Sequence, residues 1–109
     1  MTVQQLIDAA GLTPIRMPAP ERVVNGAYVG DLLSWVMGRA REDDAWITIM
    51  SNSNIIAVAS LADVSCIILA EGVNPDAGVA ETAEAKGVNL LSSSESAYEI
   101  AKRLAGLGV

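Results

Sequence analysis

The sequence predicts an α/β fold in which a small, mainly parallel β-sheet is flanked by helices. From Ala45 onward, segments typical of strands alternate with segments typical of helices, and polar residues stand at each junction. Such alternation implies right-handed crossovers between parallel strands. Hydrophobic residues make up 51% of the chain but aromatic residues only 4%, which predicts a core of closely packed small aliphatic side chains. A length of 109 residues predicts one domain, 1–109.

The first element is a helix over 2–10, because its apolar residues recur at helical spacing. Thr2 is the expected N-cap and Gly11 the expected stop. The stretch 12–16 predicts a short edge strand. Prolines lack an amide hydrogen, so those at 14, 18 and 20 predict an irregular path as far as Glu21.

The next predicted strand is Val23–Val24, which would end in a tight turn at Asn25–Gly26. Tyr28 and Val29 begin a further element. Asp31 is then the expected cap of a helix with an apolar stripe, namely Leu32, Leu33, Val36, Met37 and Ala40. Trp35 lies at the edge of this stripe, and its indole either covers the core or belongs to a partner surface.

The middle of the chain predicts a turn at Asp43–Asp44 and a buried strand over 45–50. A helix over 55–62 follows, capped by Ser53 or Asn54. The segment is apolar almost all round, so periodicity alone also allows a strand, but its alanines favour the helix. A helix without a polar face must be covered on two sides, and a second subunit is one such cover.

The last third predicts a strand over 64–70, followed by a helix from Asn74 to Lys86 that Gly87 ends. A strand over 88–91 comes next. Ser92 and Glu95 then form the expected capping box of a final helix. Its apolar stripe consists of Ala97, Ala101, Leu104 and Ala105.

Composition excludes several classes of function. The chain has no His, which argues against zinc sites and against catalysis by Ser–His or Cys–His pairs. Its net charge of −6 disfavours nucleic acid as a partner. Cys66, the single cysteine, lies in an apolar run and is expected to be a buried, inert thiol. The apolar stretch 55–70 is interrupted by polar residues and is too short to span a bilayer, and the first residues do not resemble a secretory signal. We therefore expect a cytoplasmic protein without membrane contact, cofactor or metal.

Four apolar segments carry a resemblance to a known family, namely Tyr28–Ser34, Trp46–Ile49, Asn54–Ala59 and Ile67–Leu69. They resemble the DRTGG domain family, specifically its small stand-alone members, over nearly the whole chain. The resemblance implies a fold similar to that of the N-terminal domain of HPr kinase/phosphorylase, and a regulatory or assembly module of unresolved ligand. The kinase activity of that enzyme belongs to another domain with a P-loop, and this sequence contains no such motif.

Two loops depart from the family pattern. The family often has Thr-Gly-Gly after the long buried strand, whereas this chain has Ala70-Glu71-Gly72 and keeps only Gly72. The stand-alone members tend to have His-Pro where this chain has Asn52-Ser53. An activity that depends on that imidazole is not expected here.

Three polar junctions are expected at the carboxyl ends of the last three strands. Backbone amides and helix dipoles there favour an anion such as a phosphate, and open α/β sheets bind ligands at this edge. The alternative is that these residues only cap helices and form turns. The candidate ligand-binding residues are Ser51, Asn52, Ser53, Asn54, Glu71, Gly72, Asn74, Ser92 and Ser93. The candidate interface residues of an expected homodimer are Trp35, Ile55 and Val58.

The sequence thus favours a non-catalytic regulatory or ligand-sensing module that binds a nucleotide or phosphorylated metabolite. The alternative is a protein-interaction subunit that docks on a signalling kinase or a metabolic enzyme complex without a small ligand. A third hypothesis is a small enzyme that acts on a phosphorylated compound, with a carboxylate, Lys86 or Lys102 as its base. The carboxylates at 81, 84, 95 and 99 are spaced as solvent-facing charges, so no catalytic residue is predicted.

Overall fold

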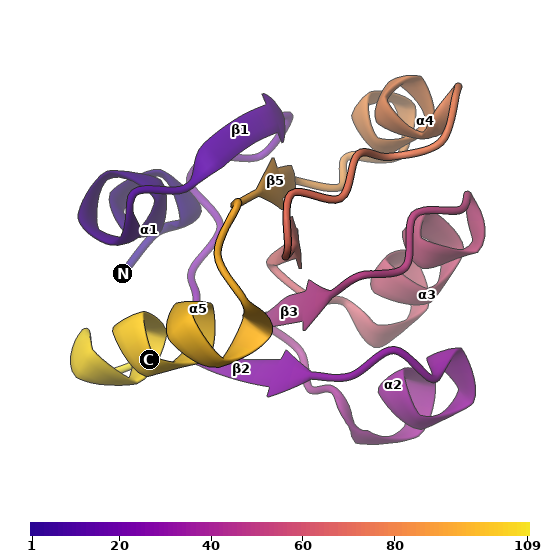
Figure 1. Cartoon of the computed structure of the whole chain (residues 1–109). Coiled ribbons are helices and arrows are strands. Elements are labelled where there is room, and N and C mark those ends of the chain that lie inside the picture. Colours follow the sequence, from indigo (N-terminus) through magenta and orange to yellow (C-terminus); the bar gives the residue numbers. More distant parts are fainter.

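The computed structural model describes residues 1–109 and contains one five-stranded sheet (Figure 1). The strand order is β1-β5-β4-β3-β2. Strands β2 to β5 are parallel to one another, and β1 pairs antiparallel with β5. The strands are β1 (Thr13–Arg16), β2 (Gly26–Val29), β3 (Asp44–Thr48), β4 (Cys66–Leu69) and β5 (Leu90–Ser92). The mainly parallel α/β sheet predicted from the sequence is therefore confirmed.

Helices cover both faces of the sheet, so the molecule has three layers (Figure 1). α1 (Val3–Ala10) and α5 (Ala97–Gly106) lie on one face. α2 (Leu33–Arg39), α3 (Asn54–Ala62) and α4 (Val79–Lys86) lie on the other, in the order of the strands that they follow. None of the five helices combines the length and the apolar character of a membrane-spanning segment.

Alternation along β3 and β4 divides the core into two halves. Ala45, Ile47 and Cys66 face α1 and α5, whereas Trp46 and Ile67 face α2, α3 and α4. Every residue of β3 and β4 is buried, as expected for central strands that have helices on both faces.

Several predicted elements are confirmed at their expected places. Thr2 caps α1 through a capping box with Gln5, and Gly11 ends the helix in the left-handed conformation at φ 69°. Gly87 ends α4 in the same way at φ 72°. The buried strand in 64–70 and the helix in 55–62 are also present.

The prediction of a Val23–Val24 strand is wrong. Val23 forms only a single bridge to Thr2, and the amide of Val24 donates to the carbonyl of Met1, so this segment fastens the start of α1. Gly26 does not close a turn but begins β2, opposite Asp44. The pairing that decides where the strand begins comes from β3, which follows later in the sequence.

Asp31 does not cap α2, which begins at Leu33 without a side-chain cap. Its carboxylate accepts instead from the hydroxyl of Thr48 and from the amide of Ile49. The predicted stripe is also wrong at two positions, because Leu32 and Met37 are 56% and 50% exposed.

The predicted beginnings of α4 and α5 are wrong as well. α4 begins at Val79 after Gly78, because the Asp76 carboxylate accepts from the Ser51 hydroxyl and its amide donates to the Ser51 carbonyl. Ser92 lies in β5, and Ser96 caps α5 by accepting from the amide of Glu99. Each of these helices therefore has its N-cap four residues later than predicted, at Gly78 and Ser96.

The sequence predicted that α3 is covered on two sides, with a second subunit as one option for the second side. In the structure both sides are covered by the same chain. α3 packs between α2 and α4, and Ile55 and Val58 are 0% and 6% exposed within the core. These two side chains therefore cannot form an interface with another copy, and the prediction for them is wrong. Only Trp35 of the three expected interface residues is at the surface, where it is 51% exposed.

Candidate functional site

The three predicted polar junctions meet at the carboxyl edge of the sheet and are joined by hydrogen bonds. Ser51 bonds to Asp76 through both side chain and backbone. The amide of Gly72 donates to the carbonyl of Ser93 at 2.9 Å, and the amide of Glu71 donates to that of Glu95 at 2.8 Å. The sheet therefore brings segments 51–54, 71–76 and 92–95 together.

The loops after β4 and β5 form hydrogen bonds with each other. Glu71 and Gly72 both have positive φ, 61° and 69°, which turns their amides toward the loop after β5. The amide of Ser93 donates to the carbonyl of Leu69, and its hydroxyl accepts from the amide of Glu95. Ser92 is half-buried in β5, and Asn74 is exposed on the loop. These residues hold loops in place and leave few donors for a ligand.

The loop before α3 differs, because the amides of Ser51, Asn52 and Ser53 donate to no group of the chain. The first amides of α3 itself are already paired. That of Asn54 donates to the Asn52 side chain at 2.9 Å, and those of Ile55 and Ile56 donate to the carbonyls of Asn52 and Ser53. Three consecutive free amides beside the positive end of a helix dipole are suited to an anion.

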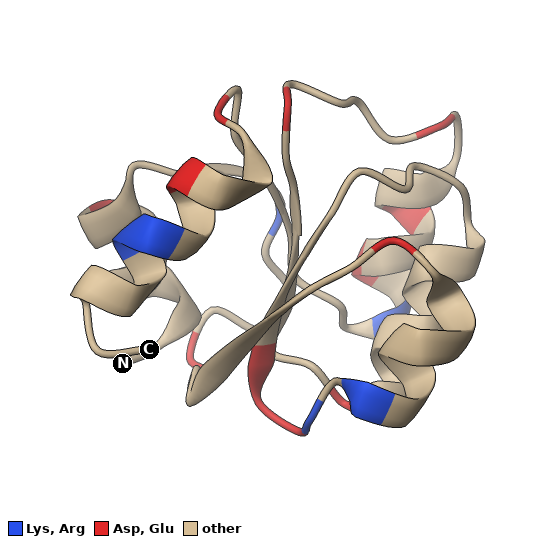
Figure 2. Ribbon diagram, turned by 60° about the horizontal axis from the view of Figure 1, so that its bottom comes forward, with Lys and Arg blue, Asp and Glu red and all other residues tan.

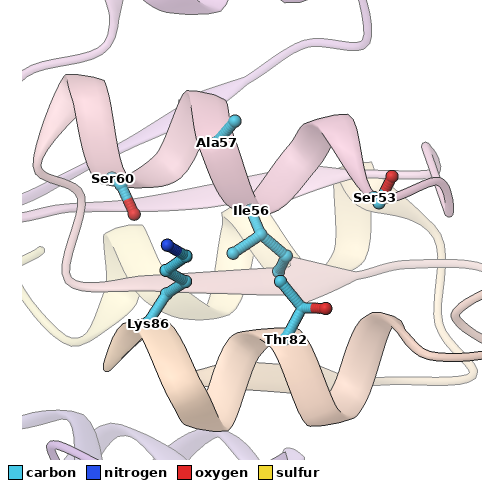
Figure 3. A pocket seen from close by; sticks show the side chains of 6 residues that line it. All are labelled: Ser53, Ile56, Ala57, Ser60, Thr82 and Lys86. Carbon is cyan, nitrogen blue, oxygen red and sulfur yellow. The ribbon is translucent and has the colours of Figure 1, made fainter.

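A groove of about 230 Å³ begins at this loop and runs between α3 and α4 (Figure 3). Its lining consists of Ser53, Ile56, Ala57, Ser60, Thr82 and Lys86. In Figure 3, Ser53 stands at one end, and the side chains of Ser60 and Lys86 point toward each other at the other end. A helix rises 1.5 Å per residue, so the seven steps from Ser53 to Ser60 span roughly 10 Å.

The groove presents donors that the protein does not use. The hydroxyls of Ser53 and Ser60 and the ammonium of Lys86 bond to no other group of the chain, and Lys86 forms no ion pair. Thr82 is different, since its hydroxyl donates to the carbonyl of Gly78. A methyl-lined floor with two hydroxyls and one ammonium can hold a small anionic or hydroxylated molecule.

Charge is distributed unevenly between the two ends of the strands. Loops at the carboxyl edge carry Asp31, Glu71 and Asp76. Figure 2 shows that several of the acidic residues of the chain, in red, lie on loops. At the opposite edge, Arg22 bridges the carboxylates of Asp43 and Asp63 at 2.9 and 3.0 Å. The carboxylates at the carboxyl edge limit how much negative charge a ligand can bring there.

The sequence predicted one residue at the end of the groove but not the polar residues along its length. Ser53 was a predicted site residue, whereas Ser60, Thr82 and Lys86 were not predicted to bind a ligand. Ser60 and Thr82 are polar residues on otherwise apolar or charged helices, which is a weak signal. Only the packing of α3 against α4 places their side chains in one groove.

Cys66 is fully buried, and desolvation raises the pKa of its thiol to about 12. A thiol with that pKa is protonated at neutral pH and is a poor nucleophile. No three carboxylate or cysteine side chains of the chain converge in a way that could hold a metal ion. The polar side chains that line the groove are therefore three hydroxyls and one ammonium.

The fold is that of a small three-layer α/β domain with a shallow groove between two of its helices. The chain belongs to the DRTGG domain family, whose model matches residues 20–107. This match confirms the resemblance seen in the apolar segments. None of the curated proteins matches the sequence.

One solved structure similar to this chain contains the CBS and DRTGG domains of the regulatory region of Clostridium perfringens pyrophosphatase, complexed with its activator, diadenosine tetraphosphate. The TM-score is 0.71 and the sequence identity 16%. The match covers 94% of this chain but 45% of the other. The likeness therefore shows a shared fold, and this chain spans less than half of that regulatory region.

Proposed function

We propose that this protein is a non-catalytic regulatory module that binds a small phosphorylated molecule, such as a mononucleotide. The phosphate would accept hydrogen bonds from the free amides of Ser51, Asn52 and Ser53. The rest of the ligand would lie along the groove toward Ser60 and Lys86. The observation that carries this proposal is the run of three unpaired amides, the last of which belongs to Ser53 at one end of the groove.

The size and charge of the site favour a ligand with a single phosphate. A volume of about 230 Å³ is below the 300 to 1,000 Å³ that is common for sites of drug-sized ligands. Asp76 stands beside the amides through its bond to Ser51, so a polyphosphate would meet a carboxylate there. Lys86 supplies one positive charge to the other end of the groove.

Two further observations support a regulatory role. The family and fold are shared with a domain found in the regulatory region of a pyrophosphatase that was crystallised with a nucleotide activator. The lining of the groove suits binding better than proton transfer, since hydroxyls and a lysine ammonium do not act as general bases near neutral pH.

Thermal unfolding in the presence of inorganic phosphate, AMP, ATP and diadenosine tetraphosphate tests the proposal. A ligand at a hundred times its dissociation constant adds about 2.7 kcal/mol of stability, which at roughly 4 to 8 °C per kcal/mol raises Tm by about 11 to 22 °C. We expect AMP to raise Tm more than ATP. If none of the four raises Tm, the proposed ligand class is wrong.

Two variants locate the site. Ser53→Pro removes one of the three amides, and the φ of −63° at this position matches proline. Lys86→Glu reverses the charge at the far end, and Lys102→Glu is the control, with the same change on α5. We expect the first two variants to weaken binding of AMP by about 10-fold or more and the control to change it little. Unchanged affinity in both variants would place the ligand elsewhere.

A second candidate function is a protein-interaction subunit that docks on a signalling kinase or a metabolic enzyme. Exposed apolar side chains on and before α2 favour it, namely Leu32, Trp35 and Met37. Affinity purification separates the two functions. A stoichiometric partner protein, lost in Trp35→Ala and retained in Lys86→Glu, would favour docking without a small ligand.

A further inference from the structure

Asparagine is followed by glycine at one place in the chain, Asn25–Gly26, where β2 begins. A backbone amide nitrogen can attack the side-chain carbonyl carbon of the asparagine before it, and the intramolecular arrangement favours this attack. A following glycine hinders the attack least, because it has no Cβ and tolerates the backbone rotations that ring closure needs. Asparagine counts among the thermolabile residues of proteins.

Each of the other asparagines lacks a requirement of this reaction. Asn74 is followed by Pro75, which has no amide hydrogen to lose. Asn89 is 1% exposed, and its side chain is held by three hydrogen bonds. Asn54 lies in α3 before a β-branched residue, and the side-chain oxygen of Asn52 accepts from the amide of Asn54 at 2.9 Å. The sequence and the fold therefore favour the pair at the start of β2.

The side chain of Asn25 is free to move. It is exposed, and its amide donates only one long bond, of 3.5 Å, to the carboxylate of Asp43. The backbone amide of Asn25 donates to the carbonyl of Asp43 at 2.9 Å, which holds the peptide on its amino side. The peptide on its carboxyl side can rotate, because Gly26 tolerates the compensating change in φ. The side chain can thus turn over the amide that follows it.

Packing requires glycine at position 26. A Cβ at Gly26 would lie 2.8 Å from Oδ1 of Asp44. Asp44 is only 8% exposed, and its other carboxylate oxygen accepts from the amide of Arg41 at 2.8 Å. A larger residue at position 26 would displace the carboxylate that closes the turn before β3. The glycine that makes Asn25 reactive is therefore a consequence of the fold.

We propose that Asn25 is a site of spontaneous deamidation in the folded protein, with water as the only co-reactant. The amide nitrogen of Gly26 forms a bond to the side-chain carbonyl carbon of Asn25. The bond from that carbon to Nδ2 breaks, and the displaced nitrogen leaves as ammonia with the proton of the Gly26 amide. Water then opens the cyclic imide at either carbonyl and returns a proton to the glycine nitrogen. The product is aspartate, or isoaspartate where the bond to the backbone carbonyl is the one that breaks.

Either product places a new carboxylate beside Asp43. Arg22 already pairs with both Asp43 and Asp63, so the added charge has no cation of its own. Like charges on neighbouring strands destabilise their pairing. Isoaspartate also adds a methylene group to the main chain next to Gly26, which pairs with Asp44, and this disturbs the register of β2 on β3. The modification therefore loosens β2 from β3.

Mass spectrometry of tryptic peptides tests the proposal, because trypsin separates the asparagines. Peptide 23–39 contains only Asn25, peptide 42–86 contains Asn52, Asn54 and Asn74, and peptide 87–102 contains Asn89. The folded chain is incubated for several weeks at mildly alkaline pH in water enriched in heavy oxygen, beside the same chain unfolded in guanidinium chloride. In the folded chain we expect peptide 23–39 to exchange an amide for a labelled acid and to separate into two products of equal mass. The other two peptides should not change.

Two results would overturn the proposal. Conversion of peptide 23–39 in the unfolded chain alone would show that the fold keeps Asn25 from reacting. Conversion of peptide 42–86 ahead of peptide 23–39 would place the reactive asparagine elsewhere. Asn25→Gln is the matched control, because its longer side chain needs a larger ring, and peptide 23–39 of this variant should stay unchanged.

Asn25→Asp reproduces one product and measures its effect on the fold. We expect a Tm about 2 to 4 °C below that of the unmodified chain, because the new carboxylate faces that of Asp43. The control Asn74→Asp makes the same change of charge on the exposed loop before α4 and should leave Tm nearly unchanged. Equal Tm values for the two variants would contradict the loosening of β2.

Discussion

The carboxylate of Asp31 accepts a hydrogen bond of 2.8 Å from the hydroxyl of Thr48, the last residue of β3. The same carboxylate oxygen accepts from the amide of Ile49 at 3.0 Å, and the Thr48 oxygen accepts from the amide of Met50 at 3.2 Å. The loop after β2 is thereby fastened to the first residues of the loop that presents the free amides of Ser51 to Ser53.

Removal of this carboxylate should loosen the loop before α3. We expect Asp31→Ala to lower the free energy of unfolding by about 1 to 2 kcal/mol, because two donors lose a charged acceptor. Urea titration measures the loss. Asp31→Asn keeps an acceptor at the same place and should lose less. If the Ala and Asn variants were equally stable, the hydrogen bonds to Thr48 and Ile49 would not support the loop.

Asn89 ties three segments together inside the protein. Its side chain is 1% exposed; it accepts from the amide of Ala19 and donates to the carbonyls of Ala19 and Ser65. Asn89→Ala leaves these backbone groups unpaired, and we expect a loss of about 2 to 4 kcal/mol. Chemical denaturation measures it. The matched control Asn74→Ala, on the exposed loop, should change stability by less than about 0.5 kcal/mol.

Burial of Cys66 makes stability depend on pH in the alkaline range. The pKa of its thiol is about 12 in the folded protein, against an ordinary value of 9.0. Above pH 9 the unfolded chain loses this proton while the folded chain keeps it. Stability from this group is therefore complete below pH 9 and is lost as pH rises toward 12, by about 1.4 kcal/mol per pH unit.

Comparison with Cys66→Ala isolates the contribution of the thiol from other alkaline titrations. The difference in unfolding free energy between the two proteins should be constant below pH 9 and should shrink from pH 9 to 11. A difference that does not change with pH would contradict the raised pKa of Cys66.

Two glycines should respond to alanine in opposite directions. Gly78 precedes α4 with a φ of +87°, where an L side chain is strained, so Gly78→Ala should lower stability by about 1 kcal/mol. Gly38 lies inside α2 with open space around its Cβ position, so Gly38→Ala should raise stability by up to about 1 kcal/mol. Each kcal/mol corresponds to roughly 4 to 8 °C in Tm, which calorimetry resolves. A stabilising Gly78→Ala would show that the turn before α4 is not held at this φ.

Sequence patterns predicted the elements whose signals are local. The capping box of Thr2 and the left-handed glycines at 11 and 87 were found because each acts within one turn of its own helix. The buried strands β3 and β4 were found because their apolar content reflects burial between two helical layers. The family was found from the same apolar segments.

Residues that local rules assigned to the starts of helices bond elsewhere. Asp31 and Ser92 are good capping residues and Asp76 suits a first helical turn, but Asp31 bonds to β3, Asp76 bonds to Ser51, and Ser92 pairs with Leu69 in the sheet. Each of these partners lies 17 to 25 residues away along the chain. A long-range partner that forms in the folded protein competes directly with a local cap, and nothing in the local sequence shows that it exists.

By itself the sequence determined the fold class, the two-sided burial of the central strands and the polar character of the carboxyl edge, because these follow from local propensity and hydrophobic periodicity. Only the tertiary structure decided which of those polar groups remain free, where α3 and α4 form a groove, and which strands lie at the edges of the sheet. These properties depend on contacts between segments distant in sequence. In the folded protein some hydrogen-bonding groups are paired and others stay free. Which groups are paired depends on the relative positions of all the elements.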